Sequence, residues 1–192
     1  MQEKFLILIC GLPGAGKTVR ARLLEKELSS YILIDQNEIR RRRGIKRMPK
    51  SQDATLREID VLAAKYLRLG KGVIIDSVNR YLFRRHQLYG VASGCGKRAL
   101  VLEVVCSEKI AKERMRRRTK GDALLSDPAD IAVYDRLKKL WEDVSIDFKY
   151  PGEDHVGYIQ FDSEKQKLKK IIMRKGMASF VKKVENILKR TP

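Results

Sequence analysis

The chain has 192 residues, of which 42 are lysine or arginine and 24 are aspartate or glutamate, so its formal net charge is +18. This length suits a single domain over residues 1–192 with one sizeable core, and no stretch approaches the ~20 consecutive apolar residues of a membrane span. The positive excess favours a polyanionic partner, most simply nucleic acid, over a heat-adapted surface, which would carry both signs in balance.

The first predicted element is a strand, because residues 5–10 form a continuous apolar run of the kind that is buried on both faces of a sheet. Its short length and its position directly before a glycine-rich segment favour a core strand over a signal peptide. That segment, Gly11 to Thr18, reads G-x-x-x-x-G-K-T, and apolar residues at helical spacing follow as far as Leu28. Strand, glycine loop and helix together are typical of a phosphate-binding P-loop.

The residue types of this loop predict its chemistry. Glycines let backbone N–H groups turn inward around an anionic oxygen, and the start of the helix adds its positive dipole. Lys17 is expected to reach the β- and γ-phosphates of ATP, and the Thr18 hydroxyl to ligate Mg²⁺. The residues predicted to contact ATP in this loop are Gly11, Pro13, Gly14, Ala15, Gly16, Lys17 and Thr18. The alternative is a glycine turn that only packs a helix on a strand.

Strands and helices alternate along the rest of the chain. Further strands are predicted at residues 31–34, 72–76, 99–105 and 158–161. Helices are predicted from a cap at Ser51 or Asp53 to Gly70, over residues 80–91, from a cap at Ser107 toward Arg118, and from the Asp127–Pro128 start signal through residue 141. Residues 37–50 suit a loop or short helix, and residues 164–190 a basic amphipathic helical region interrupted around Gly176.

This alternation predicts an α/β fold, with a five-stranded parallel sheet covered by helices on both faces. Ligands of such sheets bind beyond the carboxyl ends of the strands. Gly11, Asp35 and Asp76 all follow or end predicted strands, so we expect them to meet at one edge.

Three groups of residues carry less information. The cysteines, Cys10, Cys95 and Cys106, are odd in number and lack metal-ligand spacing, which predicts free thiols in a reducing cytoplasm. His86 and His155 are far apart in the sequence, and we expect neither to be catalytic. Basic clusters at residues 40–50, 114–120 and 165–190 either contact a polyanion or form solvated helix faces.

Residues 5–163 resemble the small P-loop kinases, a group that includes polynucleotide 5′-hydroxyl kinases, zeta-toxin-like kinases and gluconate-kinase-like enzymes. Four segments carry the resemblance. They are the P-loop itself; residues 37–40, where the family has Asp-x-x-Arg; residues 69–79, similar to G-x-x-V-I-x-D-x-T-N; and residues 113–118, similar to the lid motif E-R-x-x-x-R.

The resemblance implies a P-loop NTPase fold, an arginine-rich lid over about residues 112–130, and a set of roles. Arg40 would hold a phosphate of the acceptor, while Asp76 and Asn79 would organise the acceptor side and the water shell of the metal. Arg114 and Arg118 would close on the ATP phosphates, where a guanidinium can meet two oxygens of the transferring group.

The general base is where the chain departs from the family. The family's aspartate is replaced by Asn37, which cannot accept a proton. If the strand stays extended, Asp35 shares a face with Asn37, which makes Asp35 the preferred substitute over Glu38. A weak or absent base is a further alternative, because positioning and electrostatics alone support some turnover. Asp35 could instead serve only as a turn or helix cap.

We therefore predict a cytoplasmic, ATP- and Mg²⁺-dependent kinase that acts on a hydroxyl of a nucleic acid or a nucleotide-like polyanion, with no membrane partner. One alternative is a kinase for a small metabolite. The other is an ATP-dependent RNA-binding protein without transferase activity, to which the replacement by Asn37 points.

Overall fold

The computed structural model describes residues 4–44, 49–117, 131–149 and 154–190, with side chains in the third helix described from residue 54 onward. None of the helices in these ranges combines the length and the apolarity that crossing a membrane requires. Arg118, most of the predicted lid and the Asp127–Pro128 signal lie outside the described residues.

The described strands form one six-stranded sheet in the order β2-β3-β1-β4-β5-β6. Their bounds are β1 (Phe5–Cys10), β2 (Tyr31–Asp35), β3 (Gly72–Asp76), β4 (Arg98–Val105), β5 (Val156–Asp162) and β6 (Lys167–Ile172). The first five are parallel to their neighbours, which confirms the predicted α/β class and the five parallel strands, and β6 is antiparallel to β5.

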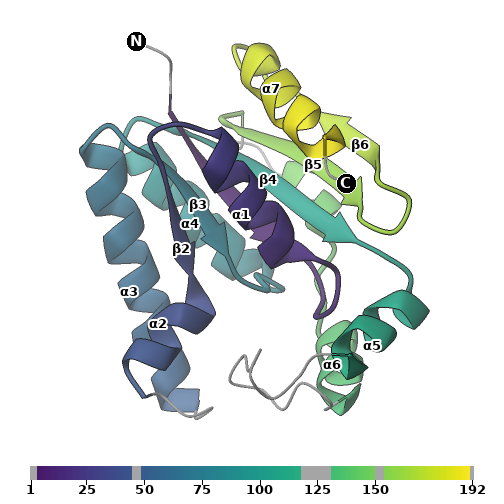
Figure 1. Cartoon of the computed structure of the whole chain (residues 1–192). Helices are drawn as coiled ribbons and strands as arrows, with labels where there is room; N and C mark the ends of the chain where they lie inside the picture. The colour runs from purple at the N-terminus through teal and green to yellow at the C-terminus, as the bar shows by residue number, and fades with distance from the viewer. Residues whose placement is uncertain (1–3, 45–48, 118–130, 150–153, 191–192) are drawn as a thin grey trace.

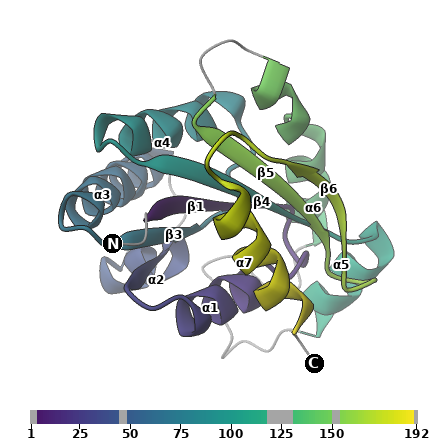
Figure 2. The same cartoon turned by 90° about the horizontal axis from the view of Figure 1, so that it is seen from above.

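Helices cover both faces of the sheet, as Figure 2 shows. One face carries α1 (Lys17–Glu27) and α7 (Ala178–Lys189), and the other carries α3 (Pro49–Arg68) and α4 (Leu82–Gly94). The rings of Phe5 and Phe180 stack with centroids 4.0 Å apart and so join β1 to α7. Alternate residues of each central strand therefore enter two separate apolar layers.

The predicted helical region at residues 164–190 is wrong in its first half, which forms β6, while its second half forms α7. The strand lies at the edge of the sheet and most of its side chains are exposed. In the sequence, its lysines therefore resemble the exposed face of a basic helix. Lysines on an edge strand also discourage pairing with another chain.

The alternative left open at residues 37–50 is decided for a short helix, α2 (Gln36–Arg42). Two other features differ from the sequence analysis. Helix α3 begins at Pro49, before either predicted cap. The short 3-10 helix η2 (Val144–Lys149) was not predicted. The cap at Ser107 is confirmed, because its Oγ accepts a hydrogen bond from the N–H of Ile110 at the start of α5 (Glu108–Arg116).

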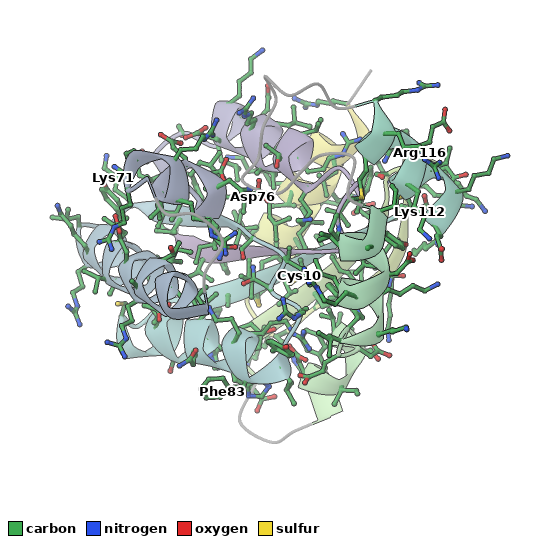
Figure 3. All side chains as sticks on the ribbon, turned by 90° about the horizontal axis from the view of Figure 1, so that it is seen from below. Cys10, Lys71, Asp76, Phe83, Lys112 and Arg116 are labelled. Atoms are coloured by element: carbon green, nitrogen blue, oxygen red, sulfur yellow. The ribbon has the colours of Figure 1, made fainter. Side chains whose placement is uncertain are left out.

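The carboxyl ends of the parallel strands gather at the lower edge of the molecule in Figure 1, beside the P-loop, α2, α5 and α6 (Ile131–Lys139). Figure 3 looks onto this edge, with Asp76 near its middle and Lys112 and Arg116 of α5 toward its rim. The register of the sheet places Asp35 directly opposite Asp76. The expected meeting of Gly11, Asp35 and Asp76 at one edge is thus confirmed.

Candidate active site

The P-loop is fixed by two close backbone approaches that only glycine allows. Gly11 has φ 147°, and a Cβ there would lie 2.4 Å from the carbonyl oxygen of Val104. Gly14 has φ 79°, and a Cβ there would lie 2.3 Å from the carbonyl oxygen of Ala111. The end of β4 and helix α5 therefore press directly on the loop, which holds its backbone in the curled conformation that phosphate binding requires.

The polar centre of the site is a contact between Thr18 and Asp76. The Thr18 hydroxyl donates a 2.6 Å hydrogen bond to Asp76 Oδ2, and Lys17 Nζ donates to the carbonyl of Leu12 at 3.0 Å. Asp76 is only 2% exposed. Burial is the main reason that the pKa of Asp76 is raised, with Asp35 adding to the rise, while Lys17 and the Thr18 hydrogen bond oppose it. The site is thus arranged around a carboxylate whose charge lacks full solvation.

The oxygen atoms of Thr18 and Asp76 are suited to bind Mg²⁺ together with a nucleotide. A hydroxyl and a carboxylate oxygen are the hard ligands that Mg²⁺ prefers, and it usually adds waters and substrate phosphates to one or two carboxylates. In the part of the chain that the structure describes, no three His, Cys, Asp or Glu side chains group as a metal cage. The donor set of Thr18 and Asp76 therefore fits a metal that arrives with a nucleotide.

Asp35 caps helix α2. Its Oδ1 accepts hydrogen bonds from the backbone N–H groups of Asn37, at 2.7 Å, and Glu38, at 3.4 Å. The cap interpretation is confirmed, and both bonds fall on the same oxygen. The expectation that Asp35 and Asn37 share a strand face is wrong, because α2 begins at Gln36 and turns the chain directly after Asp35.

The loop after β3 is braced against the P-loop. Asn79 has φ 47°, and its Nδ2 donates a 2.9 Å hydrogen bond to the carbonyl of Ile9. The N–H of Gly11 donates to the carbonyl of Val78 at 3.4 Å. The amide nitrogen of Asn79, a residue predicted to organise the acceptor side, is thus engaged with β1.

A buried ion pair behind this loop escaped the sequence analysis. Arg85 of α4 and Asp147 of η2 are both 0% exposed and share two 2.7 Å hydrogen bonds. Arg85 Nη1 also donates to the carbonyls of Asn79, at 3.1 Å, and Arg80, at 2.9 Å, and Tyr89 donates to Asp147 at 2.6 Å. A buried guanidinium is stable only when its N–H groups are hydrogen-bonded. Arg85 therefore holds the carbonyls of Asn79 and Arg80 in place.

Arg114 lies beside the P-loop, where the lid resemblance expects it. Its Nη1 donates to Ser163 Oγ at 2.8 Å and to the carbonyl of Gly14 at 3.4 Å. Ser163 in turn donates to the carbonyl of Ala15 at 2.6 Å. Burial, followed by the charge of Arg114, lowers the pKa of the nearby Arg20. Ser163 was not predicted, although its position just after β5 follows the rule that sites lie beyond carboxyl ends.

Arg118 lies outside the described residues, and the remaining predicted residues lie within them. Arg40 lies in the last turn of α2 and is half-buried, as is Asn37 in its first turn, while Glu38 is exposed. The three cysteines are free thiols, as expected, and burial raises the pKa of Cys10.

Comparison with known proteins agrees with this geometry. Residues 6–142 match the AAA domain family AAA_33, and the chain belongs to that family. It has a P-loop kinase-like fold, as three similar structures illustrate. A gluconokinase from Sinorhizobium meliloti superimposes with a TM-score of 0.55 at 18% identity, over 99% of this chain and 94% of that one.

Two further structures are similar over shorter lengths. Kti12 from Chaetomium thermophilum, in complex with ADP-AlF3, has a TM-score of 0.54 at 27% identity, covering 72% of this chain and 80% of that one. A chain of the Pnkp1/Rnl/Hen1 RNA repair complex has a TM-score of 0.55 at 15% identity, covering 74% of this chain and 47% of that one.

The substitution Asp76→Asn is expected to stabilise the protein without nucleotide at neutral pH, raising Tm by about 2–4 °C. Because the folded state raises the pKa of Asp76, it binds a proton more readily than the unfolded state does, so stability is lost as pH rises through the shifted range. Asparagine keeps an oxygen for Thr18 and carries no charge. Thermal melts from pH 4 to pH 8 should show the gain growing with pH; a variant less stable than the parent at pH 7 contradicts this.

Proposed function

We propose that the protein transfers the γ-phosphate of ATP, bound with Mg²⁺, to a hydroxyl of a nucleic acid or nucleotide-like polyanion. The observation that carries the proposal is the contact of Thr18 with Asp76 beside Lys17, with Asp35 in register on the next strand. A P-loop alone does not distinguish a kinase from a nucleotide hydrolase, because both bind nucleotide phosphates with it. A second carboxylate at the adjoining strand end gives an acceptor hydroxyl a place to lose its proton.

The chain's own groups would bind and orient the nucleotide. The backbone of Gly11, Pro13, Gly14, Ala15 and Gly16 would cradle the phosphates, and Lys17 would move from the Leu12 carbonyl to the β- and γ-phosphates. Thr18 and Asp76 would hold Mg²⁺, which when bound neutralises charge on those phosphates. Arg114, already beside Gly14, would meet the transferring group, and Arg118 would join it from the lid.

Asp35 would act as the base despite its role as a cap. Both backbone hydrogen bonds fall on Oδ1, which leaves Oδ2 to take the proton of the acceptor hydroxyl. As that proton moves to Oδ2, the hydroxyl oxygen bonds to the γ-phosphorus, the bond from the γ-phosphorus to the β,γ-bridging oxygen breaks, and ADP leaves. Asn37 then fills the family's base position as a neutral neighbour.

The proposal of a polyanionic acceptor is supported by charge. The net charge is +18, and the arginines of α2 lie at the same edge as Asp35 and Asp76. Arg40, with the asparagines Asn37 and Asn79, is the proposed acceptor-binding set. The likeness to a chain of an RNA repair complex agrees with this acceptor. A cytoplasmic location is also proposed, with the free cysteines as its support.

Transfer of γ-labelled phosphate tests the proposal directly. The acceptors offered are 5′-hydroxyl RNA, 5′-hydroxyl DNA, total tRNA and gluconate, with Mg²⁺ at low and moderate salt. We expect label on a nucleic acid, loss of label in Lys17→Ala, and weaker acceptor binding at higher salt because counterions are released on binding. Label on gluconate alone would favour a metabolite kinase, and ATP binding without any transfer would favour a non-catalytic RNA-binding protein.

In the same assay, Asp35→Asn is expected to lower kcat by about 10²–10⁴-fold, the usual contribution of a general base. The amide oxygen of asparagine still caps α2, so the melting temperature should change little. Glu38→Gln is the matched control, because Glu38 is the other carboxylate at the start of α2. This variant should keep near-parental kcat. Full turnover in Asp35→Asn combined with loss in Glu38→Gln would assign the base to Glu38.

A further inference from the structure

A cavity of about 80 Å³ lies behind the P-loop, where the end of β4 meets α6. Its walls include Gly11 and Leu12 of the loop, Glu103 of β4, Tyr134 of α6, and Trp141 just after α6. The proposed phosphate and metal contacts do not use Glu103, Tyr134 or Trp141. Aromatic walls with one convergent polar group are typical of a small-molecule subsite.

Glu103 is one of the residues that line this cavity. The side chain is only 6% exposed, and the two hydrogen bonds it accepts, from the Tyr158 hydroxyl at 2.5 Å and from Gln160 Nε2 at 2.7 Å, both fall on Oε2. Among the described residues, none donates to Oε1. Oε1 is therefore available to accept a hydrogen bond from a ligand that brings an N–H or O–H group into the cavity.

The volume limits what that ligand is. A cavity of about 80 Å³ holds roughly two or three water-sized groups, whereas an engineered cavity that binds benzene has about 150 Å³. The cavity therefore does not enclose a whole nucleobase. One edge of a sugar, with one or two hydroxyl groups, fits both the space and the acceptor oxygen of Glu103.

The outer wall of the cavity is tied to the acceptor side. Glu142, next to Trp141, accepts a hydrogen bond from the N–H of Leu82, and its own N–H donates to the carbonyl of Arg80 at 3.1 Å. Both partners belong to the segment that follows Asp76. The cavity thus lies between the two sides of the site: Gly11 and Ala15 of the proposed phosphate cradle line it, whereas Arg114 and Ser163 do not.

We propose that this cavity binds the hydroxyl edge of an acceptor ribose, with Glu103 Oε1 accepting a hydrogen bond from the 2′-hydroxyl. The inference rests on the proposed function and deepens it, because it names RNA rather than DNA as the acceptor. A deoxyribose would bring no 2′-hydroxyl to Oε1, and sites built to bind a hydroxyl reject analogues that lack it.

The chain provides its own probe, since Trp141 is its single tryptophan. Trp141 fluorescence is titrated with a 5′-hydroxyl RNA tetranucleotide and with DNA of the same sequence, with no transfer needed. We expect the RNA to bind at least about tenfold more tightly, a difference within the range of one buried hydrogen bond. In Glu103→Met, which keeps the side-chain length but removes the acceptor, the ratio should fall below about threefold.

Tyr158→Phe is the matched control, because it removes the hydrogen bond that Tyr158 makes to Oε2 and keeps the Glu103 carboxylate with its Oε1. It should keep the preference for RNA; loss of the preference in this variant as well would assign Glu103 a purely structural role. If Glu103→Met alone fails to fold in a thermal melt, the double variant with Tyr158→Phe removes both ends of that bond and takes its place.

Equal binding of RNA and DNA by the parent protein would overturn the inference. A preference for ATP over 2′-deoxy-ATP that disappears in Glu103→Met would also overturn it, by assigning the cavity to the donor ribose. The binding and transfer assays separate the two proposals. A Glu103-dependent RNA preference without label transfer rejects the kinase, and equal transfer to RNA and DNA together with equal binding rejects the ribose subsite.

Discussion

The site depends on a buried carboxylate that the fold places directly against a P-loop hydroxyl. Asp76 ends β3 beside β1, and Thr18 opens the helix that β1 leads into, so a parallel register between neighbouring strands suffices to bring them within 2.6 Å. Burial makes the charge of Asp76 unfavourable. A cation held between this carboxylate and a nucleotide's phosphates would relieve that penalty, which links stability of the empty fold to its capacity to bind a metal–nucleotide complex.

The loop that carries this carboxylate is held from behind by residues far away in the sequence. Arg85 donates hydrogen bonds to the carbonyls of Asn79 and Arg80, and Asp147 forms an ion pair with Arg85. Asp147 lies beyond residue 142, where the match to the AAA domain family ends. The chain thus uses η2, an element outside the matched part, to fix the loop that follows β3. A fully paired buried ion pair of this kind gives position more than stability.

Much of this arrangement can be read from local sequence. The P-loop, the five parallel strands and the placement of Asp35 and Asp76 at strand ends follow from apolar runs and glycine spacing. Other features need the folded chain, because their partners are distant: Arg85 finds Asp147, 62 positions later, and Glu103 meets Tyr158 across two paired strands.

Two local patterns were ambiguous for physical reasons. The lysines of β6 are compatible with an exposed helix face as well as with an edge strand, and only pairing with β5 decides between them. Asp35 is compatible with a cap and with a base, and the structure shows that both cap hydrogen bonds fall on one oxygen, Oδ1.

The central claim is that Thr18 and Asp76 form a joint site for Mg²⁺ and nucleotide, and calorimetric titration of ATP with and without Mg²⁺ tests it most directly. In the parent protein, we expect Mg²⁺ to tighten ATP binding by about tenfold or more, equivalent to at least ~1.4 kcal/mol. Thr18→Val, which keeps the shape of the side chain and removes its hydroxyl, should lose most of that gain while still binding ATP through the loop. An unchanged Mg²⁺-dependent gain in Thr18→Val would contradict the account.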